Sequence, residues 1–186
     1  MGKRDNKTIT IGSAIPYLME YTDTIPTIEE ICKDEYLLGY IKSGAAVEYT
    51  EETLEEKDDL GRVSKIITTS EEARVKMGLL TFNGESLQKL VDRCKVEIDK
   101  EKNRRVTKIG GHGNAQGKYY ALCLHNIDKV DGDIWVLIVG RNTAGFSLTL
   151  AADEGSVIEP EFKAMPHDDN GTLIQYVEQL PEGATT

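Results

Sequence analysis

The chain has 186 residues, of which 39% are hydrophobic and 29% are charged, a composition typical of a soluble globular protein. A chain of this length suits one domain that buries about 70% of its unfolded surface. Asp and Glu outnumber Lys and Arg by 32 to 22, so the net charge is −10 at pH 7. Because nucleic-acid-binding proteins neutralise phosphates with Lys and Arg, this balance argues against tight DNA or RNA binding, but not against a surface that DNA passes without sticking.

The three cysteines, Cys32, Cys94 and Cys123, are widely spaced and form no CxxC pair, so neither a zinc knuckle nor a redox motif is predicted. We expect buried, reduced thiols in a cytosolic product. The N-terminal segment lacks the apolar stretch of a signal peptide, and Asn6 stands where a myristoylation signal requires Ser or Thr. No apolar run approaches the length that spans a membrane, so no membrane partner is predicted.

Residues 1–24 are predicted to form an N-terminal arm, with a short strand around Ile9 and Ile11. Gly12 and Pro16 then break regular structure. Four apolar side chains follow without helical or strand periodicity: Ile15, Tyr17, Leu18 and Tyr21. Such an arm packs either on its own domain or on a neighbouring subunit, and the sequence leaves both possibilities open.

Residues 25–62 are expected to contain a short helix, a strand and an acidic loop. Thr27 and Glu30 form a capping-box pattern, and residues 40–49 read as a strand with an irregularity at Gly44. The acidic segment 50–62 is predicted to be a solvated loop or a short exposed helix, or else a mobile projection that becomes ordered against a partner. Helical spacing would place three of its acidic side chains on one surface: Glu51, Glu55 and Asp58. Its only apolar residues are Leu54 and Leu60.

Residues 63–94 are predicted to form two strands, 63–69 and 73–82, around a TTSEE turn, followed by a helix. Asn83 is a good N-cap for that helix, and Glu85 suits its positive end. Apolar residues at helical spacing continue to Cys94, so we expect a helix over about 84–94 that covers one face of a sheet.

The remaining sequence reads as three hairpins. Residues 104–109 and 118–125 flank the loop GGHGNAQG, residues 132–140 and 146–151 flank RNTAG, and residues 157–165 and 172–178 flank HDDNG. The charged segment 95–103 is expected to be a turn or an exposed edge. The strand 134–139 is apolar on both faces, so its second face must meet a helix, another sheet or another subunit.

Together these elements predict a mainly β fold, an antiparallel β-sandwich or barrel with one flanking helix. We expect a single domain over residues 25–180 and a loose tail at 181–186.

No catalytic constellation is evident, so we expect no enzyme and no cofactor. Gly140 and Gly145 have the spacing of a phosphate-binding loop, but Phe146 stands where its lysine is required. No GxSxG motif is present. The three histidines lack metal-ligand spacing and favour ordinary turns and strands over a metal site: His112, His125 and His167.

The order of elements resembles the tail tube (major tail) proteins of long-tailed bacteriophages and related prophages. An arm leads to GYIKSGAAVEY, an acidic segment, a strand pair and NGESLQKL. The chain then closes with a strand carrying EFKAMP, the acidic turn DDNGTL and a final strand. The resemblance covers nearly the whole chain, but the family has no catalytic signature to check. Since the last strand ends near the chain terminus, we expect no appended immunoglobulin-like domain.

The resemblance implies a β-sandwich whose subunits form hexameric rings that stack into a hollow tube, through which DNA leaves the capsid. Arms and long loops would bridge successive rings, a role that falls here to residues 9–21 and 50–62. Other implied partners are tape-measure, tail-terminator and tail-tip proteins, in a virion tail assembled in the cytoplasm of the bacterial host. The lumen wall would carry polar side chains, and the candidates are Ser147, Thr149, Glu159 and Glu161. The acidic ones among them would repel DNA phosphates.

Two alternatives remain open at this stage. A tail terminator or head–tail connector on a related β fold would make single rings in place of tubes. A metal-dependent hydrolase using His112, His125 and His167 would belong to a different class altogether.

Overall fold

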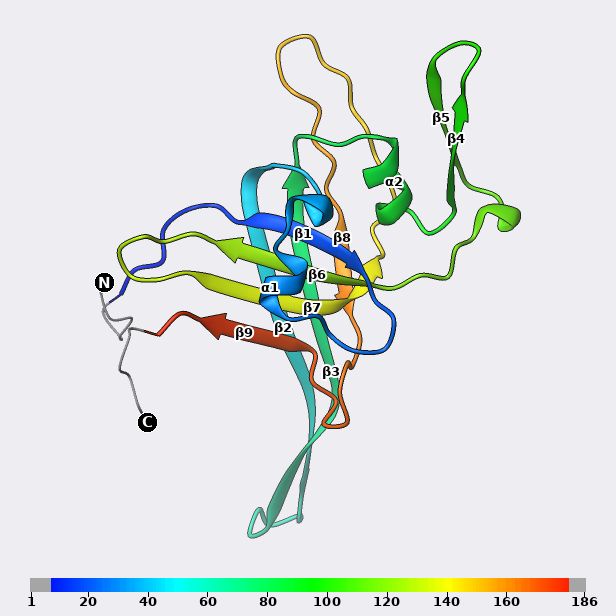
Figure 1. The fold of residues 1–186 in the computed structure, drawn as a ribbon. Coiled ribbons are helices and arrows are strands. Elements are labelled where there is room, and N and C mark those ends of the chain that lie inside the picture. Colours follow the sequence, from blue (N-terminus) through cyan, green and yellow to red (C-terminus); the bar gives the residue numbers. More distant parts are fainter. Residues whose placement is uncertain (1–7, 181–186) are drawn as a thin grey trace.

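The structure, a computed structural model, describes residues 8–180 and consists mainly of antiparallel strands with short helices beside them (Figure 1). The predicted mainly β, sandwich-like fold with a flanking helix is confirmed. Residues 1–7 of the predicted arm and the predicted tail 181–186 lie outside the described residues.

The main sheet has two parts that cross steeply and pack face to face (Figure 1). One part contains β1 (Ile15–Glu20), β6 (Tyr120–Asn126), β7 (Ile134–Asn142) and β9 (Ile174–Glu178). The other contains β2 (Ile41–Lys57), β3 (Ser64–Leu79) and β8 (Glu161–Ala164). The inner faces enclose the larger core cluster, which includes the fully buried side chains Leu18, Leu79, Leu122 and Phe162.

The doubly apolar strand β7 buries both of its faces within this chain. Ile138 points into the core between the two parts of the sheet, whereas Leu137 and Val139 point to a second cluster around Ile31. Ile31 ends helix α1 (Ile28–Ile31), so this helix provides the second dry surface. The predicted capping box is present, with the Thr27 backbone N–H donating to Glu30 at 2.8 Å.

Helix α2 (Gly84–Leu90) is shorter than the predicted 84–94. Its N-cap is as predicted, since the Asn83 side chain accepts hydrogen bonds from the backbone N–H groups of Glu85 and Ser86, each at 2.9 Å. Leu90 contributes to the inter-sheet core. The backbone becomes extended at Val91, because Cys94 already begins the next strand.

A separate two-stranded sheet follows, made of β4 (Cys94–Asp99) and β5 (Arg104–Ile109). The predicted pairing of residues 104–109 with 118–125 is therefore wrong, because β6 pairs with β1 and β7 instead. Short helical turns stand before β2 and before β6: η1 (Asp34–Tyr36) and η2 (His112–Asn114). The Gln116 side chain donates to the backbone carbonyls of Gln88 (2.9 Å) and Cys94 (3.0 Å), which ties the loop after β5 to the end of α2.

The two C-terminal hairpins are also wrong as predicted. Residues 146–151 form no strand, and β8 and β9 do not pair with each other. Both lie along the same edge of β7, with β9 opposite residues 134–138 and β8 opposite residues 140–142. The Asn142 side chain holds both ends of the loop between β7 and β8. Its amide N–H donates to the Gly145 carbonyl, and its side-chain carbonyl oxygen accepts from the Glu161 N–H at 2.9 Å.

Two further expectations in the first half of the chain are corrected. The segment from Ile15 is the regular strand β1, paired with β6, and not an irregular arm, while Ile9 and Ile11 are exposed outside any strand. The acidic segment 50–62 is neither a loop nor a helix over most of its length, because β2 continues to Lys57. Likewise β3 is continuous, and no turn interrupts it at TTSEE.

Candidate assembly interface

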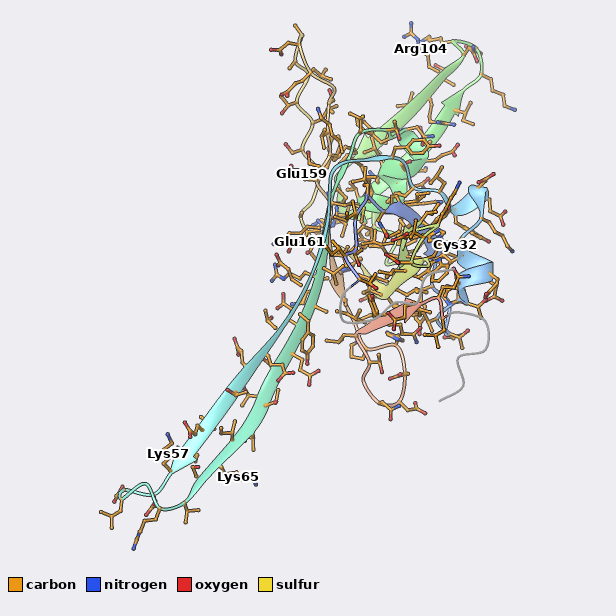
Figure 2. All side chains as sticks on the ribbon, turned by 90° about the vertical axis from the view of Figure 1, so that its left-hand side faces the viewer. Cys32, Lys57, Lys65, Arg104, Glu159 and Glu161 are labelled. Carbon is orange, nitrogen blue, oxygen red and sulfur yellow. The ribbon has the colours of Figure 1, made fainter. Side chains whose placement is uncertain are left out.

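The β2–β3 hairpin extends far beyond the body of the molecule (Figure 2). β8 pairs with β3 only from Arg74 to Lys76, so farther out β2 and β3 pair only with each other. The outer part of β2, from Thr50 to Lys57, is roughly 26 Å long at about 3.3 Å per residue. An isolated two-stranded ribbon is marginally stable in water. Contact with another surface would therefore stabilise this segment.

The outer hairpin exposes apolar side chains that are unsuited to permanent contact with water. Leu54 lies directly opposite Ile67 across the two strands, and both are exposed. Leu60 at the turn is 73% exposed, and Val63 and Ile66 on the β3 side are 70% and 64% exposed. Apolar groups gathered on a projecting element mark an interaction surface.

The same hairpin is strongly acidic. Residues 50–72 carry eight acidic and three basic side chains. Glu51 stands directly opposite Glu71, and like charges in this position destabilise a strand pair. The Tyr49 hydroxyl donates to Glu51 at 2.8 Å, and the hydrogen bond and charge of Glu51, with the charge of Glu71, raise the pKa of Tyr49 to about 12.

The structure places the predicted stacking residues in two separate parts of the fold. Glu51, Leu54, Glu55, Asp58 and Leu60 all lie on the outer hairpin or its turn. The helical spacing assumed for three of them is wrong, because Glu51 and Glu55 lie in strand β2 and Asp58 lies beyond its end. At the turn, the Asp58 carboxylate accepts from the backbone N–H of Val63 at 2.8 Å, and this bond contributes most to lowering the pKa of Asp58.

The arm residues belong to the core of this chain. Leu18 is fully buried between the two parts of the sheet, and Tyr17 and Tyr21 pack around Ile31 in the second cluster. Ile15 is half-buried at the start of β1. Of the two possibilities that the sequence left open for residues 15–21, packing on the arm's own domain is the one observed.

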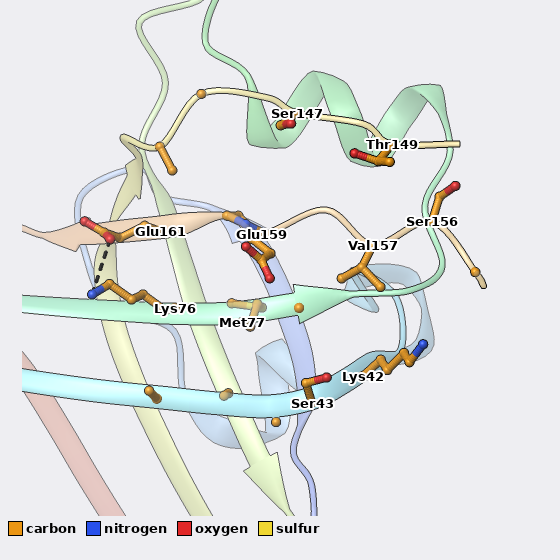
Figure 3. A pocket seen from close by; sticks show the side chains of 18 of the residues that line it. Lys42, Ser43, Lys76, Met77, Ser147, Thr149, Ser156, Val157, Glu159 and Glu161 are labelled. Carbon is orange, nitrogen blue, oxygen red and sulfur yellow. Dashed lines mark ion pairs between the residues drawn. The ribbon is translucent and has the colours of Figure 1, made fainter. Parts of the chain in front are cut away.

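The four predicted lumen residues lie around one groove of about 870 Å³, between the base of the β2–β3 hairpin and residues 144–161 (Figure 3). Ser147 and Thr149 come from an irregular segment, whereas Glu159 and Glu161 lead into and begin β8. The opposite wall is formed by the start of β2, where Ser43 and Gly44 have positive φ angles and the register with β3 shifts. The irregularity predicted at Gly44 is thus confirmed.

The two carboxylates of this groove differ in their electrostatic setting. Glu161 pairs with Arg74 at 2.5 Å and lies 3.6 Å from the ammonium of Lys76, so its charge is largely compensated (Figure 3 shows the Lys76 pair). Glu159 is exposed and forms no ion pair with a residue of 8–180. Of the two, Glu159 presents the freer negative charge.

Each histidine has a different setting. His125 stacks on Trp135 across β6 and β7, and its Nε2 lies 2.8 Å from Asp133, so it supports the β6–β7 turn. His167 is buried, and His112 is exposed in η2. Within residues 8–180, no group of three or more His, Cys, Asp or Glu side chains is placed to hold a metal ion.

All three cysteines are free thiols. Cys94 and Cys123 are buried, as expected, while Cys32 is half-buried with its Sγ 3.7 Å from that of Cys123. The hydrogen bond with Cys32, together with burial, raises the pKa of Cys123.

Sequence reasoning missed one projecting element, the β4–β5 hairpin. It exposes Ile98, Val106 and Ile109 and carries a basic turn. Its turn lies at the opposite end of the molecule from the β2–β3 turn, as the positions of Arg104 and Lys57 show (Figure 2). The alternation of Val96 and Ile98 with charged residues in KVEIDK was the signal for this strand.

Comparison with known protein families finds no family that matches this sequence, and comparison with curated proteins also finds no match. In the part of the chain that the structure describes, no helix is long and apolar enough to cross a membrane.

Proposed function

We propose that this chain is a structural virion protein that assembles as stacked, hexameric rings into the tail tube of a bacteriophage, the conduit for DNA ejection. In this proposal it is assembled in the cytoplasm of the bacterial host. It contacts tape-measure, tail-terminator and tail-tip proteins along the tube and at its ends, and it has no catalytic role.

The observation that carries the proposal is the β2–β3 hairpin. Its outer part has two exposed faces, exposed apolar side chains and unpaired edges, so a monomer leaves it in an unfavourable state. Burial against a neighbouring subunit removes this exposure. A projection that bridges successive rings is what the resemblance to tail tube proteins requires of this segment.

The acidic charge of the chain supports a DNA conduit in preference to a DNA binder. A net charge of −10 repels phosphates, and so DNA slides past the wall without being held. We place the groove with Ser147, Thr149, Glu159 and Glu161 on the lumen side. Reconstruction of assembled particles that put Glu159 on the outer surface would contradict this placement.

Electron microscopy of the concentrated purified protein tests the proposal directly. Tubes of uniform width are expected. Isolated single rings would indicate a terminator or connector instead, and a protein that forms neither rings nor tubes under any condition would contradict an assembly role.

Removing the outer hairpin should abolish tube formation without unfolding the domain. Thr50 and Glu72 are cross-strand partners, so replacing residues 51–71 with Asn-Gly closes a short hairpin in register. We expect a folded monomer by sedimentation velocity and circular dichroism, with no tubes by microscopy. Tubes of normal width from this variant would show that the outer hairpin is dispensable.

A further inference from the structure

We propose that the acidic β2–β3 hairpin of one copy binds the basic β4–β5 hairpin of the next copy, head to tail. The inference deepens the proposed function, on which it rests for the tube as the final assembly. It identifies which two surfaces of the chain meet.

The β4–β5 hairpin is a local excess of positive charge on an acidic protein. Residues 94–109 carry six basic and three acidic side chains. Lys95 and Lys108 both pair with Glu97, at 3.2 and 2.6 Å, and Arg105 pairs with Glu85 at 2.6 Å.

The turn of the hairpin carries three further cations. Lys100, Lys102 and Arg104 are exposed, and they form no ion pair with a residue of 8–180. Arg104 stands at the far end of the projection (Figure 2). Asp99 and Glu101 lie at the same turn but are outnumbered by the three cations, so the end of the ribbon keeps a net positive charge that suits an acidic surface.

The β2–β3 hairpin provides that acidic surface. Glu51, Glu52 and Glu71 are exposed and form no ion pair within residues 8–180. Glu51 and Glu71 repel each other across the strands, so a cation placed between them relieves a repulsion that the monomer retains. The benefit exists only in the complex, and therefore it favours association.

Both hairpins also present apolar side chains beside their charges. Ile98 is 68% exposed on β4, with Val106 and Ile109 exposed on β5, while Leu54 and Ile67 are exposed on the other hairpin. Complementary charges fix the partner and the register of such a contact, and the apolar groups add the burial.

The positions of the hairpins make the contact intermolecular and repetitive. Their turns lie at opposite ends of the molecule, and Figures 1 and 2 agree on this. The two surfaces therefore do not meet within one chain. Pairing of different surfaces on identical subunits leaves one free surface of each kind, so the assembly continues to grow or closes into a ring.

A charge-swap experiment tests the pairing. Variant A carries Lys100→Glu, Lys102→Glu and Arg104→Glu, so both of its hairpins are acidic. Variant B carries Glu51→Lys, Glu52→Lys and Glu71→Lys, so both of its hairpins are basic. Each variant alone should need a concentration about tenfold or more above that of the wild type to assemble, whereas an equimolar mixture should co-assemble. A single chain that carries all six changes should also recover assembly at the wild-type concentration.

Assembly is followed by sedimentation velocity and electron microscopy at low ionic strength, with circular dichroism to show that each variant is folded. A control variant, Lys33→Glu with Lys129→Glu, replaces exposed cations outside both hairpins and makes the net charge more negative by 4, compared with 6 in variant A. It should assemble like the wild type, and a loss of assembly in this control would show that net charge, and not the hairpin pairing, is responsible. Normal assembly of A or B alone, or failure of folded A and B to rescue each other, would overturn the pairing.

The outcomes separate this inference from the proposed function. If the wild type forms tubes and the charge variants form them equally well, only the hairpin pairing is overturned. Salt-sensitive head-to-tail oligomers without rings or tubes would support the pairing and contradict the tail tube. A wild-type protein that stays monomeric at high concentration and low salt would contradict both.

Discussion

His167 is a buried residue whose two ring nitrogens have no hydrogen-bond partner among residues 8–180. Burial lowers its pKa below the ordinary 6.5, against a smaller opposing effect of the neighbouring Asp168. Well above pH 6.5 the imidazole is neutral in both the folded and the unfolded chain, so it adds no pH dependence. As the pH falls from 6.5 through the lower folded pKa, the unfolded chain takes up the proton first, and the folded state loses stability.

Replacing His167 with Leu should remove this contribution. Urea unfolding at about pH 7.5 and about pH 5.5 should show a smaller loss of unfolding free energy for His167→Leu than for the wild type. The exposed His112→Leu provides the control and should keep the wild-type dependence. An unchanged pH dependence in His167→Leu would show that this histidine is not the source.

At the scale of single residues, the sequence predicted the caps and the kinks. Thr27 with Glu30, Asn83 and Gly44 were identified from the chain alone, because each acts on backbone groups only a few residues away. The structural support that His125 gives through Trp135 and Asp133 was not predicted. That support depends on which strands pair, and the sequence alone does not show that these residues become neighbours.

At the scale of elements, Gly140 controls how β8 attaches to β7. A Cβ at this position would collide with the backbone carbonyl of Lys163, so the two strands could not stay in register. We expect Gly140→Ala to lower the free energy of unfolding by about 1–3 kcal/mol, as overpacked sites do. Denaturant unfolding measures the change.

The matched control is Gly113→Ala, because a Cβ there meets open space and its φ angle is not positive. Its effect should stay within about 0.5 kcal/mol. Equal effects of the two substitutions would show that the approach of β8 to β7 does not limit stability.

Strand existence was easier to predict than strand partners. β7 was recognised from its apolar run, but β8 and β9 were assigned to each other, because adjacent strands with a turn between them usually form a hairpin. In the structure both strands pair with β7, one after the other along the same edge, and not with each other. The acidic strand was missed for a different reason: the outer hairpin has no buried face within the subunit, so it lacks the alternation from which strands are read.

At the scale of the whole molecule, the turns of the β2–β3 and β4–β5 hairpins lie at opposite ends of the chain (Figure 1). Strands 63–69 and 104–109 were predicted from the sequence, but their partners, the outer part of β2 and the strand β4, were not, because both are rich in charged residues. In the proposed assembly, contacts between chains cover both hairpins. If the hairpin pairing holds, its end-to-end direction fits the stacking of successive rings better than closure within a ring.

In the proposed tube, the stacking of rings would make growth strongly cooperative. A single contact between two charged hairpins is weak, but a ring that stacks on another ring forms all of its contacts together, and their free energies accumulate. We therefore expect assembly to begin sharply above a critical concentration, below which the protein remains monomeric.

Because the contact combines opposite charges, raising the ionic strength from about 0.1 M to about 1 M shortens the screening length from about 10 Å to about 3 Å and should raise that critical concentration. Sedimentation of polymer from a concentration series at each salt level measures it. A sedimented fraction that grows without a threshold would contradict stacked rings, and a threshold that salt leaves unchanged would contradict the charge pairing.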